Sequence, residues 1–66
     1  MNKEQVINYV RDNYRFGKIQ NGFDFIYSSK EFNSLNVNDK CFVIKKTAKY
    51  FAEDVDTLML LFNLLF

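Results

Sequence analysis

The chain has 66 residues, of which nine are Lys or Arg, eight are Asp or Glu and none is His, so its formal net charge at pH 7 is +1. A single domain, 1–66, of this size buries only about 60% of the surface that its unfolded chain exposes, so its stability depends on good packing or on a partner. One cysteine excludes an intrachain disulfide, and the lack of histidine excludes the common Cys/His zinc site.

The first predicted element is a helix that starts after Asn2, a residue type that caps helix N-termini. Its apolar residues recur at helical spacing and form one stripe: Val6, Ile7, Val10 and Tyr14. Arg11 and Arg15 lie one turn apart and off this stripe. Gly17 is the predicted stop, because glycine tolerates the left-handed conformation in which many helices end.

Asn21 and Gly22 form the strongest turn signal in the chain, because both accept the positive φ that a two-residue type I′ hairpin requires. The sequence therefore predicts a β-hairpin over 16–27, in which 16–20 pairs with 23–27. Aromatic residues alternate along the second strand and give it an apolar side: Phe23, Phe25 and Tyr27. An isolated hairpin is not stable in water, so this side is expected to pack on a helix.

A pair of helices is predicted after the hairpin. Ser28 and Glu31 fit a capping box at the start of a short helix over 29–35, and a turn at 36–38 follows. Apolar residues then keep to one helical face: Val37, Cys41, Ile44, Ala48 and Phe51. The segment 40–45 also fits a buried strand. The last helix either runs unbroken to the C-terminus or breaks at 53–56, and we favour the break because Asp54 is a good N-cap.

The segment 27–51, YSSKEFNSLNVNDKCFVIKKTAKYF, resembles a helix-turn-helix, which joins a short helix, a turn and a second, longer helix. It also resembles the core of winged-helix domains, although the predicted hairpin precedes the helix pair, whereas a wing follows it. The resemblance implies DNA binding, and an ordinary helical hairpin without that role has the same pattern. The expected fold class is α+β and mostly helical, with three or four helices and one hairpin, winged-helix-like at best.

A basic face is expected on the second helix of this pair, opposite its apolar stripe. Lysines neutralise phosphates, and an exposed aromatic ring among them can stack on bases. The candidate nucleic-acid contacts are Lys45, Lys46, Lys49, Phe42, Arg11 and Arg15. The alternative is a solvated lysine face with Phe42 packed under the hairpin.

The C-terminal segment is apolar on every side of its predicted helix, and Asn63 is almost its only polar residue. A helix of this kind must be buried all round, but the core of so small a chain covers one face. Burying each further Leu or Phe is worth about 1.5–3 kcal/mol. We therefore expect a homodimer. Its predicted interface consists of Leu60, Leu61, Leu64, Leu65 and Phe66. Complete burial within the monomer is the alternative.

Enzymatic and cofactor-dependent functions are not expected. The usual general base, histidine, is missing, and Cys41 lies on the predicted apolar stripe, where a thiol is inert. Helix capping accounts for Glu53, Asp54 and Asp56 better than metal binding does, so we expect no metal, no cofactor and no small-molecule substrate. The apolar run 58–65 is far shorter than the roughly 20 residues that span a bilayer, so we expect a cytoplasmic protein without membrane contact.

Two functions fit these patterns. The first is a small accessory or regulatory protein that binds nucleic acid through a helix-turn-helix-like element, as a homodimer. The second is a phage or mobile-element type protein that binds a protein partner, as an inhibitor of a host enzyme or an adaptor of a replication enzyme. The near-neutral charge and the 48% hydrophobic content suit the second function.

Overall fold

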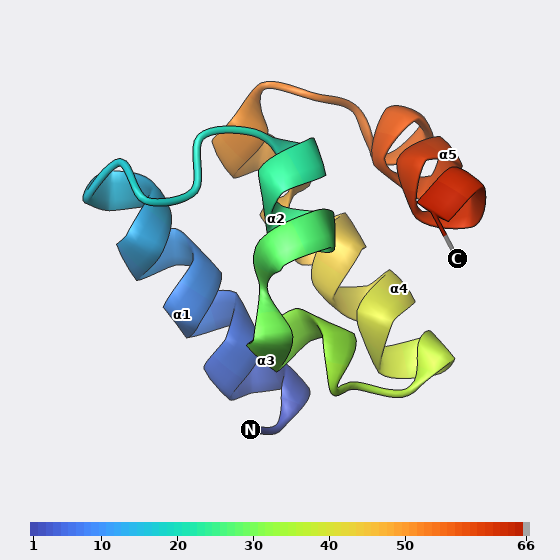
Figure 1. The fold of residues 1–66 in the computed structure, drawn as a ribbon, viewed down its shortest axis with the longest axis horizontal. Helices are drawn as coiled ribbons and strands as arrows, with labels where there is room; N and C mark the ends of the chain where they lie inside the picture. Colours follow the sequence, from blue (N-terminus) through green and yellow to red (C-terminus); the bar gives the residue numbers. More distant parts are fainter. Residues whose placement is uncertain (66) are drawn as a thin grey trace.

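The computed structural model describes residues 1–65, apart from the side chain of Leu65, and consists of helices and short loops over this range (Figure 1). Its elements in chain order are α1 (Lys3–Arg15), α2 (Gly22–Ser28), α3 (Lys30–Asn33), α4 (Val37–Thr47), the 3-10 helix η1 (Ala48–Phe51) and α5 (Val55–Leu65). No strand occurs in the described residues, so the predicted α+β, winged-helix-like fold class is wrong. The described part of the chain forms five α-helices instead of three or four.

The segment predicted as a β-hairpin, 16–27, holds the C-cap of α1, a loop and most of α2. Asn21 is the N-cap of α2, and its side-chain oxygen accepts a hydrogen bond of 2.9 Å from a backbone N–H in the first turn. Asparagine suits both turns and helix caps, so the Asn-Gly pair does not distinguish the two structures. The buried residues of α2 do distinguish them, because Gly22, Phe25 and Ile26 recur at helical spacing rather than alternating.

Gly22, the first residue of α2, packs against Leu58 of α5. A Cβ atom at this position would overlap Leu58 Cδ2 and Glu53 Oε2. Leu58 is fully buried in the core, so its side chain has little space into which it can move. Gly22 is therefore needed for the close approach of two helices, and not for the positive φ that a type I′ turn requires.

The predicted helix pair is present, with shifted boundaries. α3 is capped by Ser29 instead of Ser28, and the Ser29 hydroxyl accepts a 3.2 Å hydrogen bond from a backbone N–H of α3. Asn36 caps α4 in the same way at 2.8 Å, so α4 begins at Val37. The strand alternative for 40–45 is wrong, because these residues lie inside α4.

The predicted break before the last helix is confirmed. η1 ends at Phe51, Ala52 adopts a left-handed conformation with φ 55°, and α5 begins at Val55. The Asp54 carboxylate caps α5 by accepting a 2.7 Å hydrogen bond from the Thr57 backbone N–H. This bond lowers the pKa of Asp54, because it stabilises the charged form of the carboxyl group.

The core lies around α4, on which α1, α3 and α5 all pack, while α2 packs on α5. The largest fully buried apolar side chains come from every α-helix: Val6, Val10, Phe25, Ile26, Phe32, Val43, Ile44 and Leu58. The Phe25 ring centroid lies 4.5 Å from that of Phe32 and 5.5 Å from that of Phe51. These contacts join the consecutive helices α2 and α3 to η1, which lies later in the sequence, in one aromatic cluster.

Replacing Gly22 with alanine is expected to destabilise the protein by about 1–3 kcal/mol, because overpacking displaces buried side chains from their preferred positions. Helix propensity alone predicts the opposite sign, since alanine is favoured over glycine inside a helix by up to about 1 kcal/mol. Chemical unfolding followed by circular dichroism measures the difference. A variant at least as stable as the wild type would contradict the close contact between α2 and α5.

The cap on α5 is expected to make stability depend on pH. Because the folded-state pKa of Asp54 is lowered, its stabilisation is present above the unfolded-state pKa and is lost as the pH falls through the folded-state pKa. Asp54→Ala should therefore lower the thermal unfolding midpoint at neutral pH and have little effect in acid.

Asp54→Asn is the matched control, because asparagine also caps helices but does not titrate. Its unfolding midpoint should stay close to that of the wild type at neutral pH and should depend less on pH below 5 or so. If all three proteins showed the same pH dependence of the unfolding midpoint, the ionisation of Asp54 would make no contribution to stability.

Candidate nucleic-acid interface

α1 lies beside α4 and η1 and runs in the same direction (Figure 1). Near the start of α1, Lys3 Nζ lies 4.6 Å from the centroid of the Phe42 ring in α4. Near the end of α1, the Tyr14 ring centroid lies 6.1 Å from that of Tyr50 in η1. The seam between these helices therefore carries cations and aromatic rings along its length.

The basic residues gather on this group of helices. α1, α4 and η1 contain seven of the nine Lys and Arg residues and three of the eight Asp and Glu residues. The basic residues are Lys3, Arg11, Arg15, Lys40, Lys45, Lys46 and Lys49, and the acidic ones are Glu4, Asp12 and Asp39. The rest of the chain holds two basic and five acidic residues. The net charge of +1 is thus the sum of +4 on one group of helices and −3 elsewhere.

The three predicted lysines, Lys45, Lys46 and Lys49, are all exposed. They lie on the side of α4 and η1 away from the buried residues Val43, Ile44, Thr47 and Ala48. Phe42 is half-buried next to them, and its ring centroid lies 5.6 Å from Lys46 Nζ. Lys3 was not predicted, because its place beside Phe42 depends on the pairing of α1 with α4.

Aromatic rings continue the surface toward the end of η1. Tyr14 is 40% exposed, and its ring contacts Phe51 edge-on at 5.8 Å. Lys49 Nζ lies 5.4 Å from the centroid of Tyr50, within the range of a cation–π contact. We call the surface formed by these residues the lysine–aromatic face. It consists of Lys3, Tyr14, Phe42, Lys45, Lys46, Lys49 and Tyr50.

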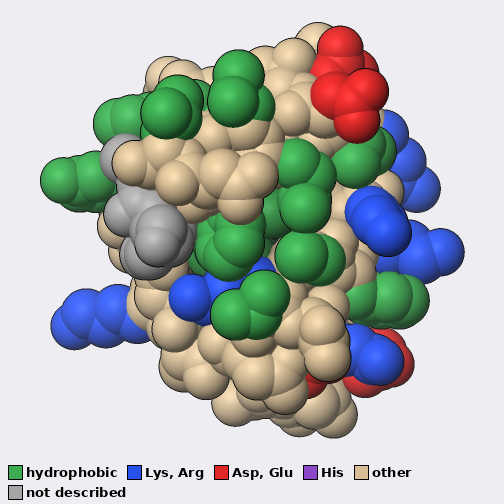
Figure 2. All heavy atoms as spheres, turned by 90° about the vertical axis from the view of Figure 1, so that its right-hand side faces the viewer, with side chains coloured by type: hydrophobic (Ala, Val, Ile, Leu, Met, Phe, Trp, Pro, Cys, Tyr) green, Lys and Arg blue, Asp and Glu red, His purple; other side chains and the backbone are tan. Residues whose placement is uncertain are grey.

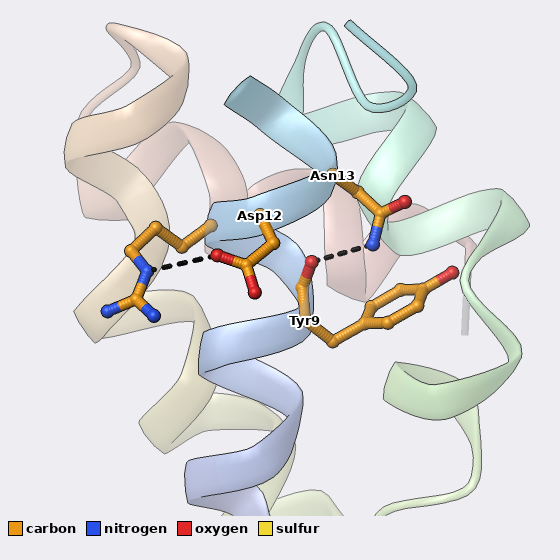
Figure 3. A network of polar contacts seen from close by, with 4 residues as sticks. Tyr9, Asp12 and Asn13 are labelled. Carbon is orange, nitrogen blue, oxygen red and sulfur yellow. Dashed lines mark hydrogen bonds and ion pairs between the residues drawn. The ribbon is translucent and has the colours of Figure 1, made fainter. Parts of the chain in front are cut away.

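The two predicted arginines lie on α1 outside the contacts that define this face. Arg11 Nε donates a long 3.4 Å hydrogen bond to Asp12 Oδ1 (Figure 3), and both side chains are partly exposed, so the pair is weak. Tyr9 and Asn13 point toward the other side of α1, where Asn13 Nδ2 donates to the Tyr9 carbonyl at 2.8 Å. Arg15 is exposed in the last turn of α1.

The predicted oligomer interface contains two strongly exposed leucines. Leu60 and Leu64 are 59% and 74% exposed and lie one turn apart on α5. The other apolar residues described in this helix are half-buried or buried: Val55, Met59 and Leu61, and Leu58 and Phe62. The Leu65 side chain and Phe66 lie outside the described part of the chain. Figure 2 shows hydrophobic side chains over much of this face of the molecule, with Lys and Arg side chains at both its left and right edges and one group between them.

The remaining candidates for chemistry do not form a site. The sequence predicted Cys41 in the core. In the structure it is half-buried at the edge of the buried face of α4 and is not part of the core. Glu53 Oε2 is buried against Gly22 and has no hydrogen-bond partner in the described structure. Within the described residues, no three His, Cys, Asp or Glu residues are placed to hold a metal ion, and no pocket is found.

Comparisons with known proteins give no relative for this chain. No family model matches it, and no curated protein or solved structure is significantly similar to it. None of the helices in residues 1–65 has the length and apolar character needed to cross a membrane.

Proposed function

We propose that this protein is a small accessory or regulatory protein that binds nucleic acid through the lysine–aromatic face. The grouping of lysines on one surface supports this most strongly, because exposed Lys45, Lys46 and Lys49 lie on the same side of α4 and η1, and Lys3 of α1 lies with Lys46 at the Phe42 ring. A polyanion is the partner that such a surface attracts. The protein binds without catalysing a reaction.

Lys45, Lys46 and Lys49 supply the charge for phosphate contacts. Their side chains are exposed, so they reach phosphates without a change in the backbone. Each phosphate that a lysine neutralises releases condensed counterions, which makes the affinity depend strongly on salt. This mechanism gives affinity for the backbone of the nucleic acid without sequence specificity.

The α3–α4 pair supports binding through a helix-turn-helix-like element. α4 is the longer, second helix of the pair, and it continues into η1, so the exposed lysines extend over a little more than one turn across the junction. α1 packs beside α4 and adds Lys3 to the same surface. The contact with nucleic acid is therefore made by helix faces.

A Lys45→Ala/Lys49→Ala variant is expected to bind a fluorescent oligonucleotide at least about tenfold more weakly at low salt. A plot of log Kd against log salt concentration should become shallower by about 2, because two phosphate contacts are lost. Fluorescence anisotropy titrations at several salt concentrations measure both quantities.

Lys30→Glu is the matched control, because it changes the net charge by the same two units at an exposed lysine of α3, outside α1, α4 and η1. It should bind almost as well as the wild type. Equal losses in the two variants would mean that net charge alone governs binding. Failure of the wild type to bind any oligonucleotide at low salt would favour the protein-binding alternative.

The second part of the proposal is that two copies associate through α5. Leu60 and Leu64 are exposed one turn apart, and burying each is worth about 1.5–3 kcal/mol. Asp56 is the only charged residue in α5, so two α5 helices can approach along their length without repulsion between charged side chains. A two-fold contact between identical faces buries both leucines of both copies.

Leu60→Ser/Leu64→Ser is expected to convert a dimer to a monomer of 7.9 kDa, as measured by light scattering coupled to gel filtration. Phe23→Ser/Tyr27→Ser is the matched control, because these residues are also exposed and one turn apart, but on α2. It should remain dimeric. A wild type that is monomeric at high concentration, or a control that dissociates equally, would exclude this interface.

A further inference from the structure

We infer that the nucleic acid bound by this protein is single-stranded and that its bases stack on aromatic rings at the C-terminal end of α1. This inference rests on the proposed function. It follows from the position of Tyr14 and Phe16, two exposed aromatic residues that flank Arg15 in the sequence and are followed by Lys18. Neither aromatic side chain is needed to fill the core.

Phe16 is the most exposed large apolar side chain in the described structure, at 79%. It lies on an ordered turn: its backbone N–H donates to Asp12 O at 3.2 Å, and the Lys18 N–H donates to Asn13 O at 2.9 Å. Ile19, which is only 6% exposed, anchors the end of this turn in the core. The backbone thus presents Phe16 to solvent in a fixed position, which reduces the entropic cost of binding.

Tyr14 is also fixed while part of its ring remains open. The ring contacts Phe51 and Tyr50, and it is nevertheless 40% exposed. Lys49 contacts the Tyr50 ring, so a cation lies next to this aromatic pair. Two positions for rings and two or more for phosphates therefore occur at the same end of α1.

This combination distinguishes a single strand from a duplex. In a duplex the flat faces of the bases are stacked on each other, and protein side chains meet only base edges and the backbone. In a single strand the base faces are free, and exposed rings among cations bind them with little sequence preference. A purely electrostatic duplex binder needs no exposed Phe16. The residues that flank Phe16 in the sequence are Arg15, Gly17 and Lys18. Asp12 lies one turn before Phe16, and its carboxylate is paired with Arg11.

The other exposed aromatic pair in the described residues lacks this setting. Phe23 and Tyr27 on α2 are stacked on each other, with ring centroids 5.3 Å apart, so each already covers one face of the other. Asp24 lies between them in the sequence, and α2 contains no Lys or Arg. These residues provide a matched control for aromatic exposure without basic neighbours.

The test compares the affinity of the wild type for oligothymidylate, oligouridylate and a DNA duplex of similar length, by anisotropy at low salt. Both single strands should bind at least about tenfold more tightly than the duplex. Phe16→Ala should weaken binding of the single strands roughly 5- to 100-fold, as expected for a lost stacking contact, and leave duplex binding unchanged. Phe23→Ala should change neither.

Phe16→Trp gives an independent readout, because the chain contains no tryptophan. Its fluorescence should be quenched by oligothymidylate and not by the duplex. Equal affinity for single strand and duplex would overturn this inference, and so would equal weakening of both by Phe16→Ala. The proposed function would still stand in either case if Lys45→Ala/Lys49→Ala loses binding. No binding to any of the three nucleic acids would overturn both.

Discussion

The parallel packing of α1 on α4 and η1 is the constraint on which the proposed site depends. Val6 and Val10 of α1 and Val43 and Ile44 of α4 all belong to the same core, so the pairing is held by apolar burial and not by the charges. Because the helices run the same way, the basic C-terminal turn of α1 lies beside the C-terminal end of η1, where Lys49 contacts the Tyr50 ring. Cations at such ends also stabilise helix dipoles, so these residues have a structural role as well. Lys3 has no such structural role, because it lies in the first turn of α1, where a positive charge is unfavourable.

α5 completes the core and leaves a second, separate surface. Leu58 and Phe62 face inward and close the core over α2 and α4, while Leu60 and Leu64 face outward. The outward leucines lie on α5 and the lysine–aromatic face lies on α1, α4 and η1, so different helices carry the two surfaces. If two copies associate, two basic faces act on one strand, and the linked second contact raises the apparent affinity without any new type of interaction.

The sequence predicted the local capping chemistry better than the architecture. Asn2 as a cap, Asp54 as a cap and the break before α5 all follow from local hydrogen bonding, which depends on only a few neighbouring residues. The hairpin was wrongly predicted at 16–27 because the local sequence there fits both a hairpin and a helix. Asparagine followed by glycine fits a hairpin and a capped helix equally, and Phe23, Phe25 and Tyr27 alternate like strand residues. Burial decides for the helix: Gly22, Phe25 and Ile26 are buried at helical spacing, and Gly22 packs on Leu58, which is far away in the sequence. The lysines of α4 were predictable from helical spacing, but their pairing with Lys3 and Tyr14 required the tertiary structure.

Net charge is a poor guide to what this protein binds, for a physical reason. At physiological ionic strength the Debye length is about 8 Å, so a bound phosphate interacts mainly with charges in its immediate neighbourhood. The molecule measures 27 × 24 × 18 Å, so much of its charge lies beyond that distance from any one point on the surface. A phosphate on the lysine–aromatic face therefore responds to the four lysines of that face more than to the net charge of the whole chain. As salt is lowered and the Debye length exceeds the size of the protein, the acidic residues contribute more. The gain in affinity at very low salt should then be smaller than the local lysines alone would give.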